Sequence, residues 1–118
     1  SMIRAEMKEW HTLTENMIRL LQIEEEEKRD LVIEQVEISL TKREELQSFI
    51  QQPFTEEEIE FGKKLILADQ QLNKKLNVYM SAIKKDLSNT QVKKDTMHNY
   101  VNPYDKVARD GTYYDTKQ

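Results

Sequence analysis

The segment QQPFTEEEIE (residues 51–60) holds the strongest turn and helix-start signals in the chain, and it decides where two helices meet. Pro53 disfavours the α conformation at the residue before it, so a helix arriving from upstream should end near residue 51. Thr55 is a good N-cap, and Glu58 three residues later completes the pattern of a capping box. The glutamates of the first turn suit the positive end of a helix. The segment therefore predicts that one helix ends before Pro53 and another begins after Thr55.

Downstream of this boundary, one long helix is expected from Glu56 to about Met97. Phe54 and Ile59 predict a hydrophobic staple at its start. At 1.5 Å per residue it would be roughly 60 Å long, so the part from Tyr79 onward would extend past the shorter helices upstream. Its apolar stripe there should need a cover: the C-terminal tail, another copy or a client. The stripe, spaced by three or four residues, comprises Phe61, Leu65, Ala68, Leu72, Leu76, Tyr79, Ile83 and Leu87.

Two further helices are expected upstream. The first runs from about Met2 to Glu24, with one apolar face. The second spans residues 29–51, and because its apolar residues lie on several sides it is expected to be the middle helix, buried against both neighbours. Between them, EEEEKRD (residues 24–30) contains no glycine or proline, so one continuous helix to Gln52 is an alternative. The run of carboxylates favours a turn near residues 25–28.

The composition indicates an all-α protein. Two glycines and two prolines in 118 residues are too few for the turns of an all-β or α/β chain. We therefore expect an up-down bundle of three antiparallel helices over residues 2–97, the third longest, followed by a short tyrosine-rich C-terminal tail over residues 98–118. Residues 1–60 carry 16 acidic and 7 basic side chains, whereas residues 61–118 carry 6 and 11. These opposite charges favour packing of the third helix against the first two.

The sequence offers no catalytic, cofactor-binding or metal-binding site. His11 and His98 lie far apart, and neither has the spacing of a metal site. There is no cysteine nucleophile and no glycine-rich phosphate loop, so an enzyme is not expected. Lysine pairs recur along the third helix without interleaved aromatic residues for base stacking, and they are interpreted as a solvated or intramolecular face. No nucleic-acid partner is expected.

The cytoplasm is the expected location. The chain has no cysteine, no secretory signal pattern and no apolar run approaching 18 residues. No membrane insertion is therefore expected either.

The tail concentrates tyrosine and turn residues. The NPY and DG sequences within it form turns readily, and tyrosine is enriched at protein interfaces because it is large and amphipathic and loses little conformational entropy. Two compatible interpretations stay open: the tail folds back over the third helix as an autoinhibitory cover, or it is a short docking element. The residues concerned are Tyr100, Asn102, Pro103, Tyr104, Gly111, Tyr113 and Tyr114.

The order of the segments carries a family resemblance. EWHTLTENMIRLLQ (residues 9–22) is followed by EEKRDLVIEQVEISLTKREEL (26–46), then by QPFTEEEIEFGKKLI (52–66) and a long lysine-rich helix. The chain closes with the tyrosine-rich YVNPY and DGTYYD, within residues 100–115. In this order the segments resemble the FliT family of flagellar export chaperones, in the form found in Bacillus-like bacteria. The resemblance covers nearly the whole chain.

The resemblance implies a cytosolic chaperone of flagellar type III protein export. Such a protein binds the filament cap protein (FliD), prevents its premature assembly and delivers it to the export apparatus, whose ATPase and gate are further partners. It also implies gate docking through Tyr100, with Tyr104 beside it. Since an amphipathic client helix needs a complementary apolar stripe, we expect the client-binding row to be Leu72, Leu76, Tyr79, Ile83 and Leu87. The alternative is a structural homodimer, a coiled coil without a client that uses the same stripe.

Overall fold

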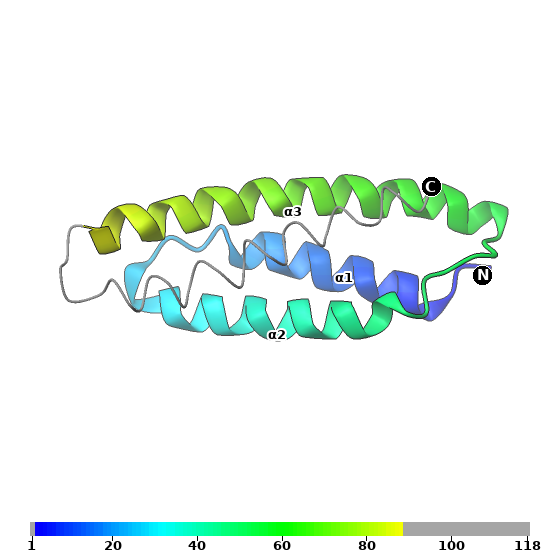
Figure 1. Cartoon of the computed structure of the whole chain (residues 1–118), viewed down its shortest axis with the longest axis horizontal. Helices are drawn as coiled ribbons and strands as arrows, with labels where there is room; N and C mark the ends of the chain where they lie inside the picture. Colours follow the sequence, from blue (N-terminus) through cyan, green and yellow to red (C-terminus); the bar gives the residue numbers. More distant parts are fainter. Residues whose placement is uncertain (1, 89–118) are drawn as a thin grey trace. The chain divides into compact units, whose positions relative to one another are not determined.

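The computed structural model describes residues 2–88, and over these residues all regular structure is helical (Figure 1). Helix α1 spans Ala5–Leu20, a short 3₁₀ helix η1 spans Glu26–Lys28, α2 spans Arg29–Gln47 and α3 spans Glu56–Ser88. With 33 residues, α3 is the longest helix of the described part. The predicted all-α class and the long third helix are therefore confirmed. The continuation of that helix to Met97 and the tail over residues 98–118 lie outside the described residues.

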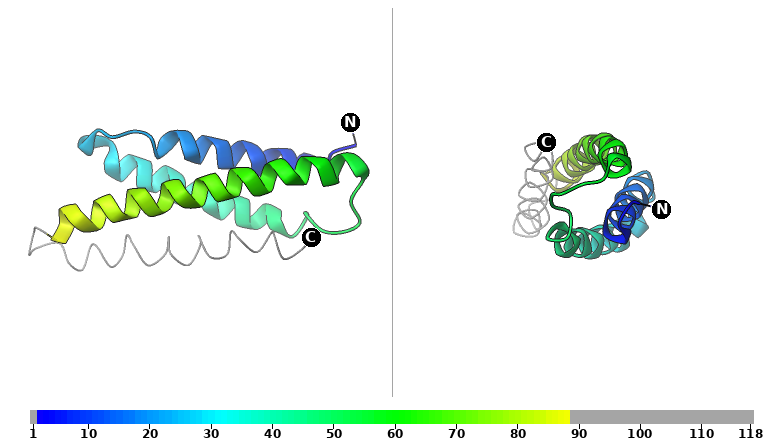
Figure 2. Two further views of the ribbon diagram at one scale, coloured as in Figure 1. Left: turned by 90° about the horizontal axis from the view of Figure 1, so that it is seen from above. Right: turned by 90° about the vertical axis from the view of Figure 1, so that its right-hand side faces the viewer.

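The chain divides into two compact units, residues 1–72 and 73–118, and α3 begins in the first and continues into the second. Within the first unit, α1 and α2 run antiparallel, and the first half of α3 reverses direction again beside them (Figures 1 and 2). Short connections join the helices, so each lies next to the one before it in sequence. This is the predicted up-down order.

The break between α1 and α2 falls where the carboxylate run predicts it. Helix α1 ends at Leu20, four residues before the predicted end, and Ile23 N–H donates to the carbonyl of Leu20 at 3.1 Å in a terminal turn. The 3₁₀ helix η1 leads directly into α2. Within this connection, Lys28 Nζ lies 3.2 Å from a carboxylate oxygen of Glu25. The acidic side chains of this connection are exposed. The alternative of one continuous helix is wrong because regular α-helix is absent between residues 21 and 28.

The connection between α2 and α3 begins earlier than predicted. Helix α2 ends at Gln47, whereas the proline signal predicted an end near residue 51. At the start of α3 the capping box is confirmed: Glu58 N–H donates to Thr55 Oγ1 at 3.0 Å, and Thr55 N–H donates to a Glu58 carboxylate oxygen at 3.0 Å. The predicted staple partner Ile59 is exposed.

The core of the first unit is made from one face of each helix. Most of the apolar side chains in this core are almost inaccessible to solvent. Fully burying one large apolar side chain stabilises a fold by about 1.5–3 kcal/mol. The apolar residues of this core are Met7, Trp10, Met17 and Ile18 from α1, Val32, Ile33, Val36 and Leu40 from α2, and Leu65, Ala68 and Leu72 from α3.

Helix α2 is buried on one face, and the expectation of burial on several sides is wrong. Val32, Val36 and Leu40 point into the core, at steps of four residues. Leu31 and Ile38, which widened the apolar pattern in the sequence, are exposed. In the first unit α2 therefore keeps an outer face that carries large apolar side chains. None of the helices described over residues 2–88 is long and apolar enough to cross a membrane.

Candidate functional site

The five residues expected to bind a client lie on α3, and they are largely covered in the structure. Leu72 is inaccessible, Leu76 and Ile83 are each 2% exposed, and Tyr79 and Leu87 are half-buried. Steps of four, three, four and four residues place them on one side of the helix. Met80, which was not among the predicted residues, is also buried on α3. The stripe is therefore not bare in the folded chain.

The residues of the predicted tail site lie outside the described residues. They are Tyr100, Asn102, Pro103, Tyr104, Gly111, Tyr113 and Tyr114.

A buried polar cluster joins the three helices of the first unit. Arg43 of α2 lies with its Nη1 atom 3.0 Å from a carboxylate oxygen of Asp69 on α3, and the same atom donates to Thr14 Oγ1 of α1 at 3.0 Å. The guanidinium also stacks over Trp10, 4.2 Å from the ring centroid. Thr14 in turn donates to the carbonyl of Trp10. Burial lowers the pKa of Arg43, and the charge of Asp69 opposes this shift.

This cluster was not predicted, although the sequence carries a signal for it. Arg43 follows Val36 and Leu40 in the buried register of α2, and Asp69 falls between Leu65 and Leu72 in the buried register of α3. Opposite charges placed inside two apolar registers indicate a buried ion pair. The apolar pattern counts only apolar residues, so it does not include these two positions.

A second polar cluster ties the N-terminus to the start of α3. The Arg4 guanidinium donates to both carboxylate oxygens of Glu58 at 2.7 Å and to the carbonyls of Phe49, Gln51 and Pro53 at 2.8–2.9 Å. It also lies 4.9 Å from the ring centroid of Phe54. One side chain thereby pairs with three carbonyls of the connection between α2 and α3.

Glu58 is the acceptor at the centre of this second cluster. The hydrogen bond from Arg4 is the main cause that lowers its pKa to about 2, and backbone N–H groups of Thr55 and Arg4 add to the effect while burial opposes it. A carboxylate that accepts several charged or backbone donors stays ionised. The cluster holds two chain segments together, and its groups are already paired with one another, so it has the character of a structural tie.

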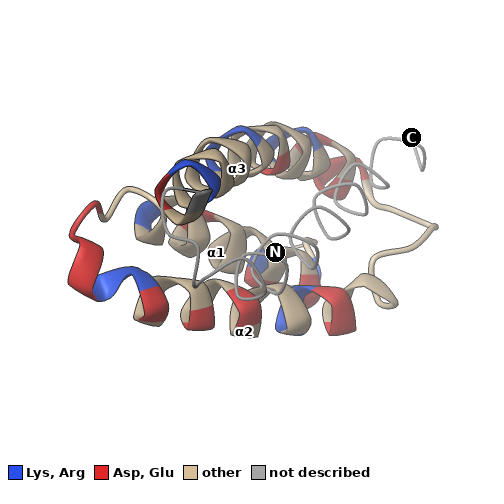
Figure 3. Ribbon diagram, turned by 60° about the vertical axis from the view of Figure 1, so that its left-hand side comes forward, with Lys and Arg blue, Asp and Glu red and all other residues tan. Residues whose placement is uncertain are grey.

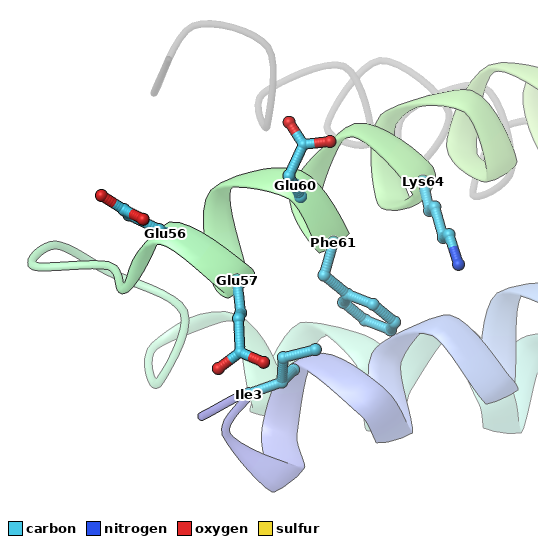
Figure 4. Close-up of a pocket in the computed structure, with 6 residues that line it drawn as sticks. All are labelled: Ile3, Glu56, Glu57, Glu60, Phe61 and Lys64. Carbon is cyan, nitrogen blue, oxygen red and sulfur yellow. The ribbon is translucent and has the colours of Figure 1, made fainter. Parts of the chain in front are cut away.

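An open groove of about 480 Å³ lies where α1 begins beside α3 (Figure 4). Figure 4 shows Phe61 and Glu57 directed toward Ile3 at the start of α1, whereas Glu56 and Glu60 point away from the ring. The polar groups therefore do not converge on a common point, as the groups of a small-molecule or catalytic site do. The lining residues are Ile3, Glu56, Glu57, Glu60, Phe61 and Lys64.

The described histidine is part of the packing between α1 and α3. His11 is half-buried, its ring centroid lies 5.5 Å from that of Phe61 in an edge-to-face arrangement, and its Nε2 is 3.7 Å from Glu15. His98 lies outside the described residues. Residues 2–88 contain no group of three or more side chains that could hold a metal ion.

The described charges are segregated between elements. Acidic side chains gather in η1 and along α2, and lysines recur along α3 (Figure 3). The surface that α2 presents is therefore acidic, and a partner of positive charge would be attracted to it.

Comparison with known proteins identifies the family of the chain. The sequence profile described as "Flagellar protein FliT" matches residues 4–102. The flagellar protein FliT of Geobacillus kaustophilus is 32% identical over 93 residues, which make up 78% of this chain and 80% of that protein. The flagellar protein FliT of Bacillus subtilis is 30% identical over 105 residues, which make up 89% of this chain and 93% of that protein. The flagellar protein FliT of Lysinibacillus sphaericus is 35% identical over 94 residues, which make up 77% of this chain and 79% of that protein. No solved structure matches the chain. Since the profile and these relatives cover most of the sequence, the resemblance seen in the order of its segments is confirmed, and the chain belongs to the FliT family of flagellar proteins.

Proposed function

We propose that the protein is a cytoplasmic chaperone of flagellar type III export. It binds the filament cap protein, prevents its premature assembly and delivers it to the export ATPase and gate. The observation that carries this proposal is the match to the FliT family across residues 4–102, which includes the three helices and the beginning of the tail. A small helical bundle without converging polar groups in its described groove fits a binding protein better than an enzyme.

The client surface in this proposal is the row on α3 that runs from Leu72 to Leu87. An amphipathic helix recognises such a row by inserting its own apolar residues at matching turns. Since Leu76 and Ile83 are each 2% exposed, the client gains this surface only through a rearrangement of the folded chain. The binding-competent state is then a minor one, and the client shifts the population toward it.

The tail has the second role in the proposal. Tyr100 and Tyr104 dock to the export gate, and the tail competes with the client for the row on α3. The tyrosine-rich composition supports this role because tyrosine gives a short segment a large amphipathic contact surface. Removal of the tail should then strengthen client binding, because one competing contact is lost.

Calorimetric titration tests the proposal. The helical C-terminal segment of the filament cap protein is titrated into the full chain and into a chain that ends at Asn99. We expect micromolar or tighter binding to the full chain and stronger binding to the truncated one. Absence of binding to both forms, at concentrations where circular dichroism shows both to be folded, would rule out this client.

A matched pair of variants locates the surface. Tyr79 is half-buried within the row, and its neighbour Val78 is 70% exposed and lies outside it. Tyr79→Ala should weaken client binding at least tenfold, since tyrosine is among the residues enriched at the energetic centres of interfaces. Val78→Ala should change the dissociation constant by less than about twofold, since Val78 lies outside the row that the client contacts. Equal losses in both variants would place the client elsewhere.

The alternative function, a structural homodimer held together by the same row, has less apolar surface available than the sequence suggested. Leu72, Leu76 and Ile83 are already buried within one chain. Sedimentation velocity over a range of concentrations distinguishes the two functions, because an obligate dimer stays dimeric and its thermal stability depends on concentration.

A further inference from the structure

Asn73 places a polar side chain on the apolar side of α3. It lies three residues before Leu76 and seven before Met80, so all three fall within about 60° of one another around the helix. Leu76 is 2% exposed and Met80 is 4% exposed. Asn73 therefore lies on the same side of α3 as the client row, one turn before Leu76.

The side-chain oxygen of Asn73 is buried without a hydrogen bond. The residue as a whole is half-buried, but its Oδ1 atom is inaccessible to solvent and has no hydrogen-bond partner in the part of the chain that the structure describes. Most buried side-chain oxygens have a partner, because an unpaired oxygen loses its hydration and gains nothing in return. This oxygen therefore destabilises the folded chain.

The type of residue adds to this cost. Asparagine is a poorer helix former than leucine, and a leucine here would bury further apolar surface beside Leu76. Residues that break such local rules of stability are often functional. Asn77, one turn further along α3, is exposed, so its amide can reach water. The two asparagines share a helix and differ in burial, which makes Asn77 a natural control.

We propose that Asn73 determines which client the row on α3 accepts, because its side-chain oxygen accepts a hydrogen bond from a hydroxyl or amide side chain of the client helix. This inference rests on the proposed function, in which an amphipathic client helix packs on the row. The client donor lies one turn away from the client residue that packs on Leu76, since Asn73 itself lies one turn from Leu76. A client without a donor there leaves the oxygen unpaired in the complex.

A neutral donor fits this position better than a charged one. Leu76 and Met80 on the same side of α3 are apolar, and Asn73 carries no charge that could balance a cation. Burying the charged group of a lysine or arginine beside them would cost far more than burying a hydroxyl or an amide. Serine, threonine, asparagine and glutamine are therefore the client residues expected to pair with Asn73.

The same oxygen also favours uncovering of the row. Leu76 and Ile83 are each 2% exposed, so a client reaches them only after the folded chain rearranges. The unpaired oxygen raises the free energy of the covered arrangement, whereas a matching client pairs with it in the complex. A ligand shifts an equilibrium only by its differential affinity for the two states, and this hydrogen bond is made in one of them.

The first part of the test measures the full chain without a client. Asn73→Leu replaces the unpaired amide by an apolar side chain of similar size, and it should raise the midpoint of thermal unfolding by about 3 °C or more. Asn77→Leu brings the same gain in helix propensity at an exposed position and should change the midpoint by about 2 °C or less. Circular dichroism follows both transitions.

The second part measures calorimetric binding of the cap-protein segment to the same chains. Asn73→Leu should weaken binding at least fivefold, roughly the cost of leaving the client donor buried without its acceptor. Asn77→Leu should leave the dissociation constant within about twofold of the wild-type value. The more stable variant should therefore be the weaker binder, which a purely structural role of Asn73 does not predict.

Substitutions in the segment then identify the donor. Each serine, threonine, asparagine or glutamine of the segment is changed to alanine in turn. One of these changes should weaken binding to the wild-type chain roughly threefold or more. The same change should not weaken binding to Asn73→Leu any further, which is the coupling expected for two groups in direct contact.

Two results would overturn this inference alone. A midpoint that falls in Asn73→Leu but not in Asn77→Leu would show that the oxygen already has a partner in the free chain. Equal affinity of the segment for the wild type, Asn73→Leu and Asn77→Leu would show that the client makes no bond to Asn73, while the proposed function would stand. Failure of the segment to bind even the wild-type chain would refute the proposed function and the role of Asn73 together.

Discussion

The guanidinium of Arg43 on α2 and the carboxylate of Asp69 on α3 lie 3.0 Å apart, and both side chains are buried. The same guanidinium stacks over Trp10 and donates to Thr14, so this side chain of α2 contacts side chains from both α1 and α3. A buried ion pair often adds little net stability, because removing two charges from water opposes their attraction. It does penalise any packing that separates them. We infer that this pair specifies the alignment of α2 against α1 and α3.

Breaking the ion pair should be far more harmful than replacing it. Arg43→Met leaves the carboxylate of Asp69 buried without its cation and should lower the free energy of unfolding by about 3–5 kcal/mol. The double variant Arg43→Met with Asp69→Leu should recover most of that loss, since no charge is left buried. Urea unfolding followed by circular dichroism measures both. Lys42→Met, at the exposed neighbouring position, is the control and should change the value by about 0.5 kcal/mol or less.

If the double variant is as unstable as Arg43→Met alone, the loss comes from the side-chain shape and its contact with Trp10, and not from the unpaired carboxylate.

Local signals allowed the helices and their connections to be predicted from the sequence. Thr55 and Glu58 cap α3 through the two hydrogen bonds that the pattern predicts, because both residues act within one turn. The end of α2 was placed four residues too late. Pro53 restricts only the residue before it. The carbonyls of the connection accept hydrogen bonds from the side chain of Arg4, which is 45 residues from Phe49 in sequence. A contact over that sequence distance is not visible in local patterns.

Burial on α2 could not be predicted for a related reason. Leu31 and Ile38 are as apolar as Val36 and Leu40, and the sequence does not say which side the neighbouring helices cover. The pairing of Arg43 with Asp69 likewise depends on the arrangement of two helices in space. For the candidate client site, the sequence predicts a row of residues on α3, whereas the burial of Leu76 and Ile83 became visible only in the structure.

The orientation of α3 predicts opposite outcomes for two leucines two residues apart. Leu65 is fully buried and Leu67 is 66% exposed. Leu65→Ala should lower the free energy of unfolding by about 2–5 kcal/mol, because it removes apolar contacts and leaves a cavity. Leu67→Ala should change it by about 0.5 kcal/mol or less. Denaturant unfolding of the two variants side by side measures the difference, and similar losses would show that α3 is rotated about its axis relative to this structure.

The N-cap of α3 should contribute measurable stability. Thr55 accepts from Glu58 N–H, and its hydroxyl donates to the carbonyl of Met2 at 2.9 Å. Thr55→Ala removes both bonds and should lower the free energy of unfolding by about 1 kcal/mol. Thr41→Ala is the matched control, because the Thr41 hydroxyl donates only within α2, to the carbonyl of Glu37. An effect of Thr55→Ala no larger than that of Thr41→Ala would contradict the capping role.

The contact between Arg4 and Glu58 should make stability depend on pH in the acid range. The pKa of Glu58 is lowered from 4.5 to about 2 in the folded chain, chiefly by the hydrogen bond from Arg4. A lowered pKa means that the ionised carboxylate favours the folded state above pH 4.5, and that this stabilisation is lost as the pH falls toward 2. Arg4→Met removes the main donor and the contacts to three carbonyls. We expect it to lower the free energy of unfolding by about 2 kcal/mol at neutral pH.

Urea unfolding of the wild type and Arg4→Met at several pH values between 3 and 7 separates the two parts of this effect. The difference between them should shrink below pH 4.5, because the unfolded chain takes up a proton at Glu58 there while the folded wild type keeps the carboxylate ionised, and the remainder reports the bonds to the carbonyls. Lys63→Met is the control, since it breaks the exposed ion pair of Lys63 with Glu60 and should cost about 0.5 kcal/mol or less. A difference that stays constant down to pH 3 would show that Glu58 gains its stability from the backbone donors of Thr55 and Arg4 alone.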